Sequence, residues 1–415
     1  MLLLYWINNY DIPTFLLIIL FLPLVYLNNG FHYDFPLIII SSVPVYLFVV
    51  LALFKFVHLE QDWQISITYL QLPVVLMVIY FIISGIMAVQ NSGDINWVAY
   101  QVFLISLYLM IFPIMYLIRR TEQYKIIFLF LLIVVIFSSF EYLLFNIIGS
   151  MGRFVTFQSG FFPIAIGVLL AYTLYSKKLP EKLLGIAILV TIIAGTFITL
   201  TRSLWATTFL VVIFVFLFYI ISQRHVTLTK LLLLLFVIVL PFLLLRDTGN
   251  RIDESTSQSK IVKYRTQSVT DPLEDSSFLM RVEFAMYSIE RFLDSPFIGQ
   301  GLGDYLKYKI FLESNKPNYY MDSTWLYLLW KGGIIGFVLF AWMYFRFFKV
   351  TFHNLMNTED TNVKIINLGL LAGLLGLSIL GVLSPLLIKY KTNALLAFIF
   401  AYVETERLKM MKHET

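Results

Sequence analysis

The sequence predicts an all-α polytopic membrane protein with about twelve transmembrane helices and one long extracytoplasmic loop that contains amphipathic helices. Three observations predict this fold class. Apolar residues make up 60% of the chain and charged residues only 13%, about half the charged share of an ordinary globular protein. The apolar residues occur in runs of about 20, the length of a helix that crosses a bilayer. One long polar stretch interrupts these runs late in the chain.

The apolar runs are expected to be helices because backbone polar groups find no water partner in lipid. They lie near residues 12–27, 37–57, 67–89, 97–118, 126–148, 161–175, 183–201, 204–222, 230–245, 324–345, 365–388 and 392–403. About eleven spans is the alternative, because the first, sixth and last runs are short. Lys and Arg gather in alternate short loops, such as Arg119–Arg120 and Lys177–Lys178. Since basic loops face the cytoplasm, both termini are expected there.

The polar stretch divides the chain into three parts. Residues 1–245 are expected to form an N-terminal bundle of about nine spans. Residues 246–323 form the extracytoplasmic loop, and residues 324–415 form the C-terminal spans and a cytoplasmic tail.

The second half of the loop carries the pattern of an amphipathic helix. Apolar residues recur at spacings of three and four from Phe278 to Leu293, which predicts a helix with one apolar face. Asp275-Ser276-Ser277 supplies N-caps, and Asp294-Ser295-Pro296 ends the helix. We expect this helix to lie on the membrane surface or over the bundle.

The composition excludes several classes of protein. A soluble enzyme is excluded because so apolar a chain cannot cover a water-facing surface. A nucleic-acid binder is excluded because the net charge is only +5 and the basic residues are dispersed between apolar runs. The chain has no cysteine and only five histidines, which lie far apart. We therefore expect neither a metal site nor a cofactor.

Three glycines alternate with other residues just after the amphipathic helix, in Pro296-Phe-Ile-Gly299-Gln-Gly301-Leu-Gly303. They follow a helix and a proline instead of a strand, which excludes a dinucleotide-binding fingerprint. Glycines in this pattern predict a tight turn with positive φ angles. The N–H groups of such a turn could hold a phosphate. The alternative, which the glycines alone favour, is a purely structural turn.

Several features occur in a fixed order in this part of the chain. An amphipathic helix with Arg281 precedes the glycine motif, and Asp322-Ser323 then opens a span that contains glycines. This order resembles the O-antigen ligase and polymerase superfamily, and Thr199-Leu-Thr201-Arg202-Ser203 is similar to that family's Arg-bearing motif. The resemblance covers roughly residues 195–345. It implies metal-independent, inverting glycosyl transfer at the outer membrane face, from a glycan carried on undecaprenyl diphosphate.

The resemblance assigns catalytic roles to Arg202 and Arg281. A diphosphate leaving group gains negative charge as the sugar bond breaks, and arginine is permanently charged and can give a phosphate two parallel hydrogen bonds. Without a metal, such fixed cations would supply most of the transition-state stabilisation. The structural alternative is that Arg202 snorkels at a helix end and Arg281 only solvates a surface helix.

Asp322 is the candidate catalytic base. Glycosyl transfer needs a group that accepts the proton of the acceptor hydroxyl. Ligase members of the superfamily have His-Asn at this point, whereas this chain has Asp322-Ser323. This difference argues against a ligase and not against a polymerase. The alternative is that Asp322 is the N-cap of the following span.

Further residues are assigned to substrate binding: Glu141, Arg153, Arg291, Gly301, Gly303 and Tyr305. Glu141 lies inside the fifth span, where an acidic residue is costly and needs a partner such as Arg153 or Arg202. A buried ion pair that only fixes helix packing is the alternative. Arg153, Lys389 and Lys391 are secondary candidates for the diphosphate because they lie on the outer side; the alternative is that they only flank or anchor their spans. The aromatic cluster around Tyr305 could contact glycan or only mark the membrane interface.

The sequence thus predicts a polymerase that joins lipid-linked oligosaccharide repeats for a surface polysaccharide, such as a capsule, at the outer face of the bacterial cytoplasmic membrane. Its expected partners are the undecaprenyl-diphosphate-linked donor and acceptor, the bilayer, a chain-length regulator and a flippase. Two alternatives remain: a ligase that moves finished glycan to a terminal acceptor, and a transporter of lipid-linked oligosaccharide. A transporter predicts broken helices and polar residues near mid-membrane, whereas the candidate residues gather toward one face.

Overall fold

The computed structural model describes residues 68–90, 94–121, 160–199, 201–223, 276–305 and 321–414, together with residues 128, 132–133 and 135–140. Within these ranges the chain forms helices and turns and no strand, which confirms the all-α class. The predicted spans at 12–27, 37–57 and 230–245 and most of 126–148 lie outside the described residues.

Six helices in the described ranges are long and apolar enough to cross a membrane. They are α4 (Gln71–Gln90), α5 (Ile95–Ser106) with its continuation through η2 (Leu107–Met110) into α6 (Ile111–Thr121), α9 (Leu179–Ile198), α10 (Arg202–Gln223), α14 (Thr324–Asn357) and α15 (Thr361–Leu383). The shorter apolar helix α8 (Phe161–Tyr175) coincides with the predicted span at 161–175. The last predicted span lies within α16 (Tyr390–Glu414).

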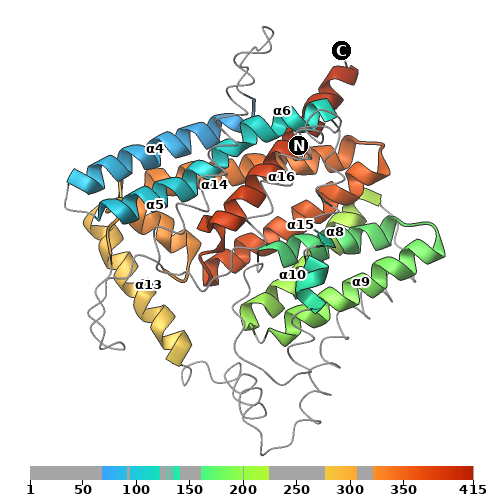
Figure 1. Ribbon diagram of the computed structural model, residues 1–415, viewed down its shortest axis with the longest axis horizontal. Helices are drawn as coiled ribbons and strands as arrows, with labels where there is room; N and C mark the ends of the chain where they lie inside the picture. Colours follow the sequence, from blue (N-terminus) through green and yellow to red (C-terminus); the bar gives the residue numbers. More distant parts are fainter. Residues whose placement is uncertain are drawn as a thin grey trace, which may run out of the picture.

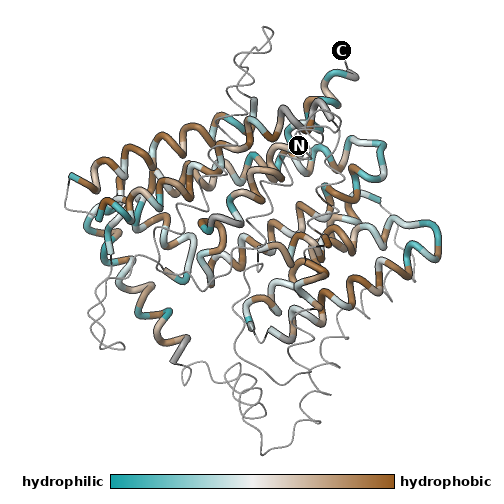
Figure 2. Tube along the Cα trace, in the orientation of Figure 1, coloured by the Kyte–Doolittle hydropathy of each residue, from teal (hydrophilic) through white to brown (hydrophobic). Residues whose placement is uncertain are grey.

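The helices form one bundle in which most axes run in similar directions (Figure 1). Helix α15 packs against α8, α10 and α14, while α16 packs against α6 and α14. Hydrophilic residues concentrate at helix ends and in the connecting loops, and hydrophobic residues fill the middle of the helices (Figure 2). This distribution is the one expected of helices that cross hydrocarbon.

Helix α16 forms part of the centre of the bundle. Every residue from Ala394 to Val403 is at most 2% exposed. Two buried amide side chains near this segment donate hydrogen bonds, Asn393 to the Leu104 carbonyl at 2.7 Å and Asn354 to the Val403 carbonyl at 2.8 Å. A buried amide needs such a partner because leaving it unpaired in an apolar interior is costly.

A glycine contact joins α8 and α15. A Cβ added to Gly167 would collide with the backbone of Gly369, and one added to Gly369 would collide with Val168. Small residues of this kind let two helix backbones approach closely inside a membrane.

The basic loops gather at one end of the bundle, to the right in Figure 1, where α8, α14 and α16 end. At the same end, Tyr69 lies against two basic residues within helices, Arg346 of α14 and Arg407 of α16, whose Cζ atoms are 4.0 and 5.6 Å from the centre of its ring. Helix α13 (Ser276–Asp294) lies at the opposite end, to the left in Figure 1. This separation agrees with the predicted orientation; the side that faces the cytoplasm stays a prediction.

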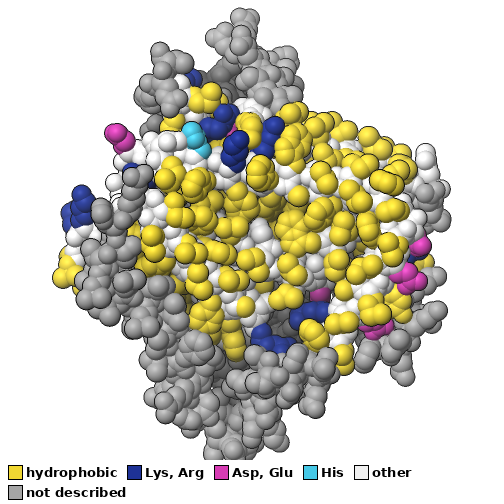
Figure 3. Space-filling view, turned by 180° about the vertical axis from the view of Figure 1, so that it is seen from behind, with side chains coloured by type: hydrophobic (Ala, Val, Ile, Leu, Met, Phe, Trp, Pro, Cys, Tyr) yellow, Lys and Arg dark blue, Asp and Glu magenta, His cyan; other side chains and the backbone are white. Residues whose placement is uncertain are grey.

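Much of the outer surface is apolar. Hydrophobic side chains cover most of the described face in Figure 3, and the charged side chains lie toward its margins. Exposed residues on the spans include Ile79, Ile83 and Ile86 of α4 and Ile334, Ile335 and Val338 of α14. Side chains of this kind on a membrane span face lipid.

Candidate active site

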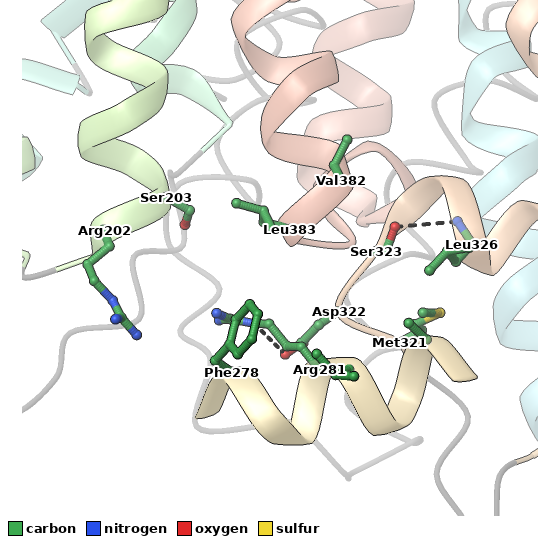
Figure 4. Close-up of a pocket in the computed structure, with 12 residues that line it drawn as sticks. Arg202, Ser203, Phe278, Arg281, Met321, Asp322, Ser323, Leu326, Val382 and Leu383 are labelled. Carbon is green, nitrogen blue, oxygen red and sulfur yellow. Dashed lines mark hydrogen bonds and ion pairs between the residues drawn. The ribbon is translucent and has the colours of Figure 1, made fainter. Parts of the chain in front are cut away.

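A pocket of about 410 Å³ lies at the end of the bundle where α10 and α14 begin and α15 ends. Figure 4 shows helix α13 lying across these helix ends and closing one side of the pocket. The lining residues are Arg202, Ser203, Phe278, Arg281, Val282, Ala285, Met321, Asp322, Ser323, Leu326, Val382 and Leu383.

The three residues predicted to be catalytic all line this pocket. Arg202 is the first residue of α10, Arg281 lies in the second turn of α13, and Asp322 lies just before α14. In Figure 4, Arg202 and Arg281 extend from opposite sides of the pocket. The fold therefore brings together groups that lie far apart in the sequence.

Arg281 and Asp322 form an ion pair, with 3.3 Å between Nε and Oδ2 (Figure 4). Their side chains are 29% and 49% exposed, so both remain open to the pocket. The ion pair uses Nε, and no hydrogen bond from the two terminal amino groups of Arg281 is present within the described part of the chain. Those amino groups can therefore point two donors at an anion in the pocket.

The N-cap of α14 is Ser323 and not Asp322. The Ser323 hydroxyl accepts from the Leu326 amide at 3.4 Å, whereas the Asp322 carboxylate pairs with Arg281. The capping alternative for Asp322 is therefore wrong. A serine hydroxyl meets the needs of the helix end, and this leaves the neighbouring carboxylate to face the pocket.

Two helix N-termini add partial positive charge to the pocket, and the C-terminal end of α15 adds partial negative charge. Helices α10 and α14 both begin at it, and Phe278 from the first turn of α13 also lines it. The N-terminus of a helix carries a partial positive charge and unpaired N–H groups, which favour an anion. This convergence of helix ends has no local sequence signal, because it depends on which helices pack together.

Lys389 adds a third cation near Asp322. It follows the short helix η4 (Leu386–Ile388) and is exposed. Desolvation by the surrounding protein lowers the pKa of Lys389, and the negative charge of Asp322 acts in the opposite direction. The sequence placed Lys389 on the outer side, and the structure adds that it lies within electrostatic range of Asp322.

The walls of the pocket are mostly apolar. Phe278, Val282 and Ala285 come from α13, Leu326 from α14, and Val382 and Leu383 from the end of α15. Such a site suits an amphipathic ligand, because apolar walls bind a hydrocarbon part while the arginines bind an anionic head. The sequence analysis did not identify Val382 and Leu383, which look like ordinary members of an apolar span.

The glycine motif forms the tight turn that the sequence predicts. Gly299, Gly301 and Gly303 have φ angles of 78°, 84° and 90°. The amide of Gly301 donates to the Lys331 carbonyl at 3.0 Å, and the amide of Gly303 donates to Gln101 Oε1 at 2.9 Å. Both glycines are buried and neither lines the pocket. Because the amide N–H groups of Gly301 and Gly303 already have partners within the protein, these glycines form a structural turn and do not hold a phosphate.

Arg291 belongs to a second polar cluster, formed with Asp304, Trp330 and Lys331. The Asp304 carboxylate accepts from Arg291 Nη2 at 2.7 Å and from Trp330 Nε1 at 2.8 Å, while its backbone carbonyl accepts from Lys331 Nζ. Lys331 is fully buried, with Nζ 3.8 Å from the centre of the Trp330 ring. This cluster fastens the end of α13 to α14. Arg291 is not among the pocket-lining residues, so its substrate-binding assignment finds no support in the geometry.

The remaining assignments have simple outcomes. Glu141 and Arg153 lie outside the described residues. Tyr305 is half-buried beyond the glycine turn and is not among the pocket-lining residues. The described residues contain no group of three His, Asp or Glu side chains able to hold a metal ion.

Residues 187–341 match the O-antigen ligase family. The match confirms the resemblance and begins within α9, so it includes Arg202, Arg281 and Asp322. A comparison with curated proteins found no match. The chain is therefore a polytopic membrane protein with a segment similar to the O-antigen ligase family.

Proposed function

We propose that this protein is a polymerase that joins undecaprenyl-diphosphate-linked oligosaccharide repeats at the outer face of the bacterial cytoplasmic membrane. The observation that carries the proposal is the pocket in which Arg202, Arg281 and Asp322 converge over apolar walls. Cations and helix N-termini suit a diphosphate, and the apolar walls suit the first isoprene units attached to it.

The reaction transfers the growing glycan from its lipid carrier to a fresh lipid-linked repeat. An acceptor hydroxyl oxygen attacks the anomeric carbon of the donor and forms the new glycosidic bond as the bond from that carbon to the diphosphate oxygen breaks. The bonding electrons leave with undecaprenyl diphosphate, and the hydroxyl proton passes to the Asp322 carboxylate. Attack opposite the leaving group inverts the anomeric centre.

Arg281 and Arg202 act on the leaving group in this scheme. The terminal amino groups of Arg281 hold one phosphate, and Arg202, across the pocket, holds the other. Their contribution grows along the reaction, because the bridging oxygen gains negative charge as its bond to the sugar breaks. Asp322 orients Arg281 through its contact with Nε and accepts the proton on its other oxygen.

A ligase is the second candidate, because the family that residues 187–341 match is described as O-antigen ligase. A ligase would use the same leaving group and differ in the acceptor. We prefer the polymerase because Asp322-Ser323 replaces the His-Asn expected of ligases at this point. A transporter is less well supported. Helix α14 does have a break, at Gly333, but Arg202 and Asp322 lie where α10 and α14 begin, and Arg281 lies on α13 outside the spans.

The decisive experiment is mass spectrometry of undecaprenyl-linked glycans from a strain that lacks the gene. A polymerase predicts single repeats and no longer chains, whereas long chains still attached to undecaprenyl would make the protein a ligase. A membrane-impermeant glycan label then separates polymerase from transporter. Labelled single repeats have crossed the membrane, which supports the polymerase; protected repeats would indicate a transporter. Complementation with the Arg281→Ala variant should reproduce the pattern of the deletion.

A further inference from the structure

Helix α13 has an apolar stripe that the bundle does not cover. Its residues recur at helical spacing and are 37–66% exposed: Phe278, Val282, Met286, Ile289 and Leu293. The opposite side of the helix packs against the bundle, where Phe284 is 6% exposed and Ser288 is 1% exposed. The helix therefore uses one side for packing and leaves its apolar stripe on the outside.

The stripe continues into the surface of two membrane spans. Phe297 and Ile298, which follow α13, are 67% and 42% exposed. The Phe297 carbonyl accepts from the Ile335 amide of α14 at 3.2 Å, and the Ile298 carbonyl accepts from the Tyr80 hydroxyl of α4 at 2.9 Å. These bonds place the end of the stripe directly beside the exposed isoleucines of α4 and α14.

The position of this junction along α14 indicates its depth in the membrane. Helix α14 is kinked at Gly333, whose φ of 59° and ψ of −163° are not helical. The part after the kink, residues 334–357, has 24 residues, and about 20 are enough to cross the hydrocarbon. Ile335 is the second residue of this part. A segment joined to α14 at this point lies near the boundary between hydrocarbon and headgroups.

We propose that the apolar stripe of α13 is embedded in the leaflet next to the pocket, in contact with lipid acyl chains. A helix with one apolar face typically lies in the membrane plane and buries that face among acyl chains. The occupant is lipid because the stripe is continuous with span surfaces that face lipid. Phe278 and Val282 also line the pocket, so α13 holds the pocket at the level of lipid headgroups. The position of α13 in the leaflet does not depend on the proposed reaction.

The absence of cysteine from the chain makes a direct test possible. Single cysteines at Met286, Ile289 and Leu293 are labelled with a bimane fluorophore in the full-length protein, reconstituted into phosphatidylethanolamine and phosphatidylglycerol vesicles. The matched control is Glu290→Cys, which lies next to Ile289 on the same helix and is exposed on its polar side. Ile83→Cys on α4 is the reference for a lipid-facing site.

Fluorescence is measured with doxyl-labelled lipid in the vesicles and, separately, with aqueous iodide. The proposal predicts that doxyl lipid quenches the labels at Met286, Ile289 and Leu293 as it quenches Ile83, and that iodide quenches only the Glu290 label. Strong iodide quenching of the stripe would mean that it faces water. Protection from both quenchers would mean that protein covers it, a second copy or another partner. Either result overturns the proposal.

Discussion

Two arginines on one helix have different surroundings. Arg281 and Arg291 lie ten residues apart on α13, about 15 Å along its axis. Arg281 faces a pocket and contacts one half-exposed carboxylate through Nε. Arg291 contacts a largely buried carboxylate, Asp304, which also accepts a hydrogen bond from the Trp330 indole. An arginine whose partner is held by other protein groups stabilises packing, whereas one with donors open to a pocket can bind a ligand.

The largest expected effect is on Arg281. The Arg281→Ala variant should lower polymer formation by about 100-fold or more, because one charged donor to a transition state typically contributes that much. Protein abundance should remain normal, and Arg202→Ala should behave alike. The measurements are polymer yield in a complemented deletion strain and immunoblots of membranes. The matched control is Arg291→Ala, which should lower the thermal stability of the protein more than its polymer formation. An equal loss of polymer from a stable Arg291→Ala protein would contradict the comparison of the two arginines.

Asp322→Asn should lower the rate by about 100-fold or more if Asp322 accepts the proton, since general base catalysis typically contributes 10²–10⁴. Asparagine keeps the size of the side chain and removes the basic carboxylate. The rate of glycan transfer from purified lipid-linked repeats tests this prediction. Retained activity would remove Asp322 as the base and leave it the role of orienting Arg281.

Asp304→Ala should destabilise the protein by about 1–3 kcal/mol, because Arg291 and Trp330 would lose a buried acceptor. Thermal denaturation in detergent measures the loss. The Asp304→Asn variant should recover part of it, since an amide oxygen can still accept from the indole. Activity per folded molecule should fall less than in Arg281→Ala. Unchanged stability in Asp304→Ala would show that the cluster does not fasten α13 to α14.

Ser323→Ala should have the smallest effect. Loss of the N-cap of α14 is expected to cost about 1 kcal/mol and to leave the rate of the folded enzyme unchanged within about twofold. Thermal denaturation and the same transfer assay separate the two quantities. A rate loss as large as that of Asp322→Asn would mean that the start of α14, and not the carboxylate itself, governs catalysis.

Much of the fold could be predicted because its signals are local. Hydropathy located the spans within the described ranges, and α8 matched the predicted residues at both ends. The apolar spacing and the flanking caps located α13, which begins at Ser276 and ends at Asp294 as predicted. The alternating glycines after α13 also predicted the positive φ angles that Gly299, Gly301 and Gly303 have. Each of these signals lies within one segment of the chain.

The candidate site could be predicted only in part. Family resemblance brought Arg202, Arg281 and Asp322 to attention, and all three line the pocket. It could not exclude Arg291 and Gly301 from the site, because their partners lie further along the chain. The Arg291 side chain pairs with Asp304, and the Gly301 amide donates to the Lys331 carbonyl of α14. Nor could the resemblance find Val382 and Leu383, whose place in the pocket depends on where α15 ends relative to α13.

The sequence by itself determined that this protein is a helical membrane protein with an amphipathic helix and a glycine turn near residue 300, because hydropathy, helical spacing and backbone freedom act over short stretches of chain. Only the tertiary structure decided that Ser323 caps α14, that Asp322 pairs with Arg281, and that the glycine amides are used internally. Hydrogen bonds and ion pairs form between groups within a few ångströms. Which groups come that close depends on how the helices pack.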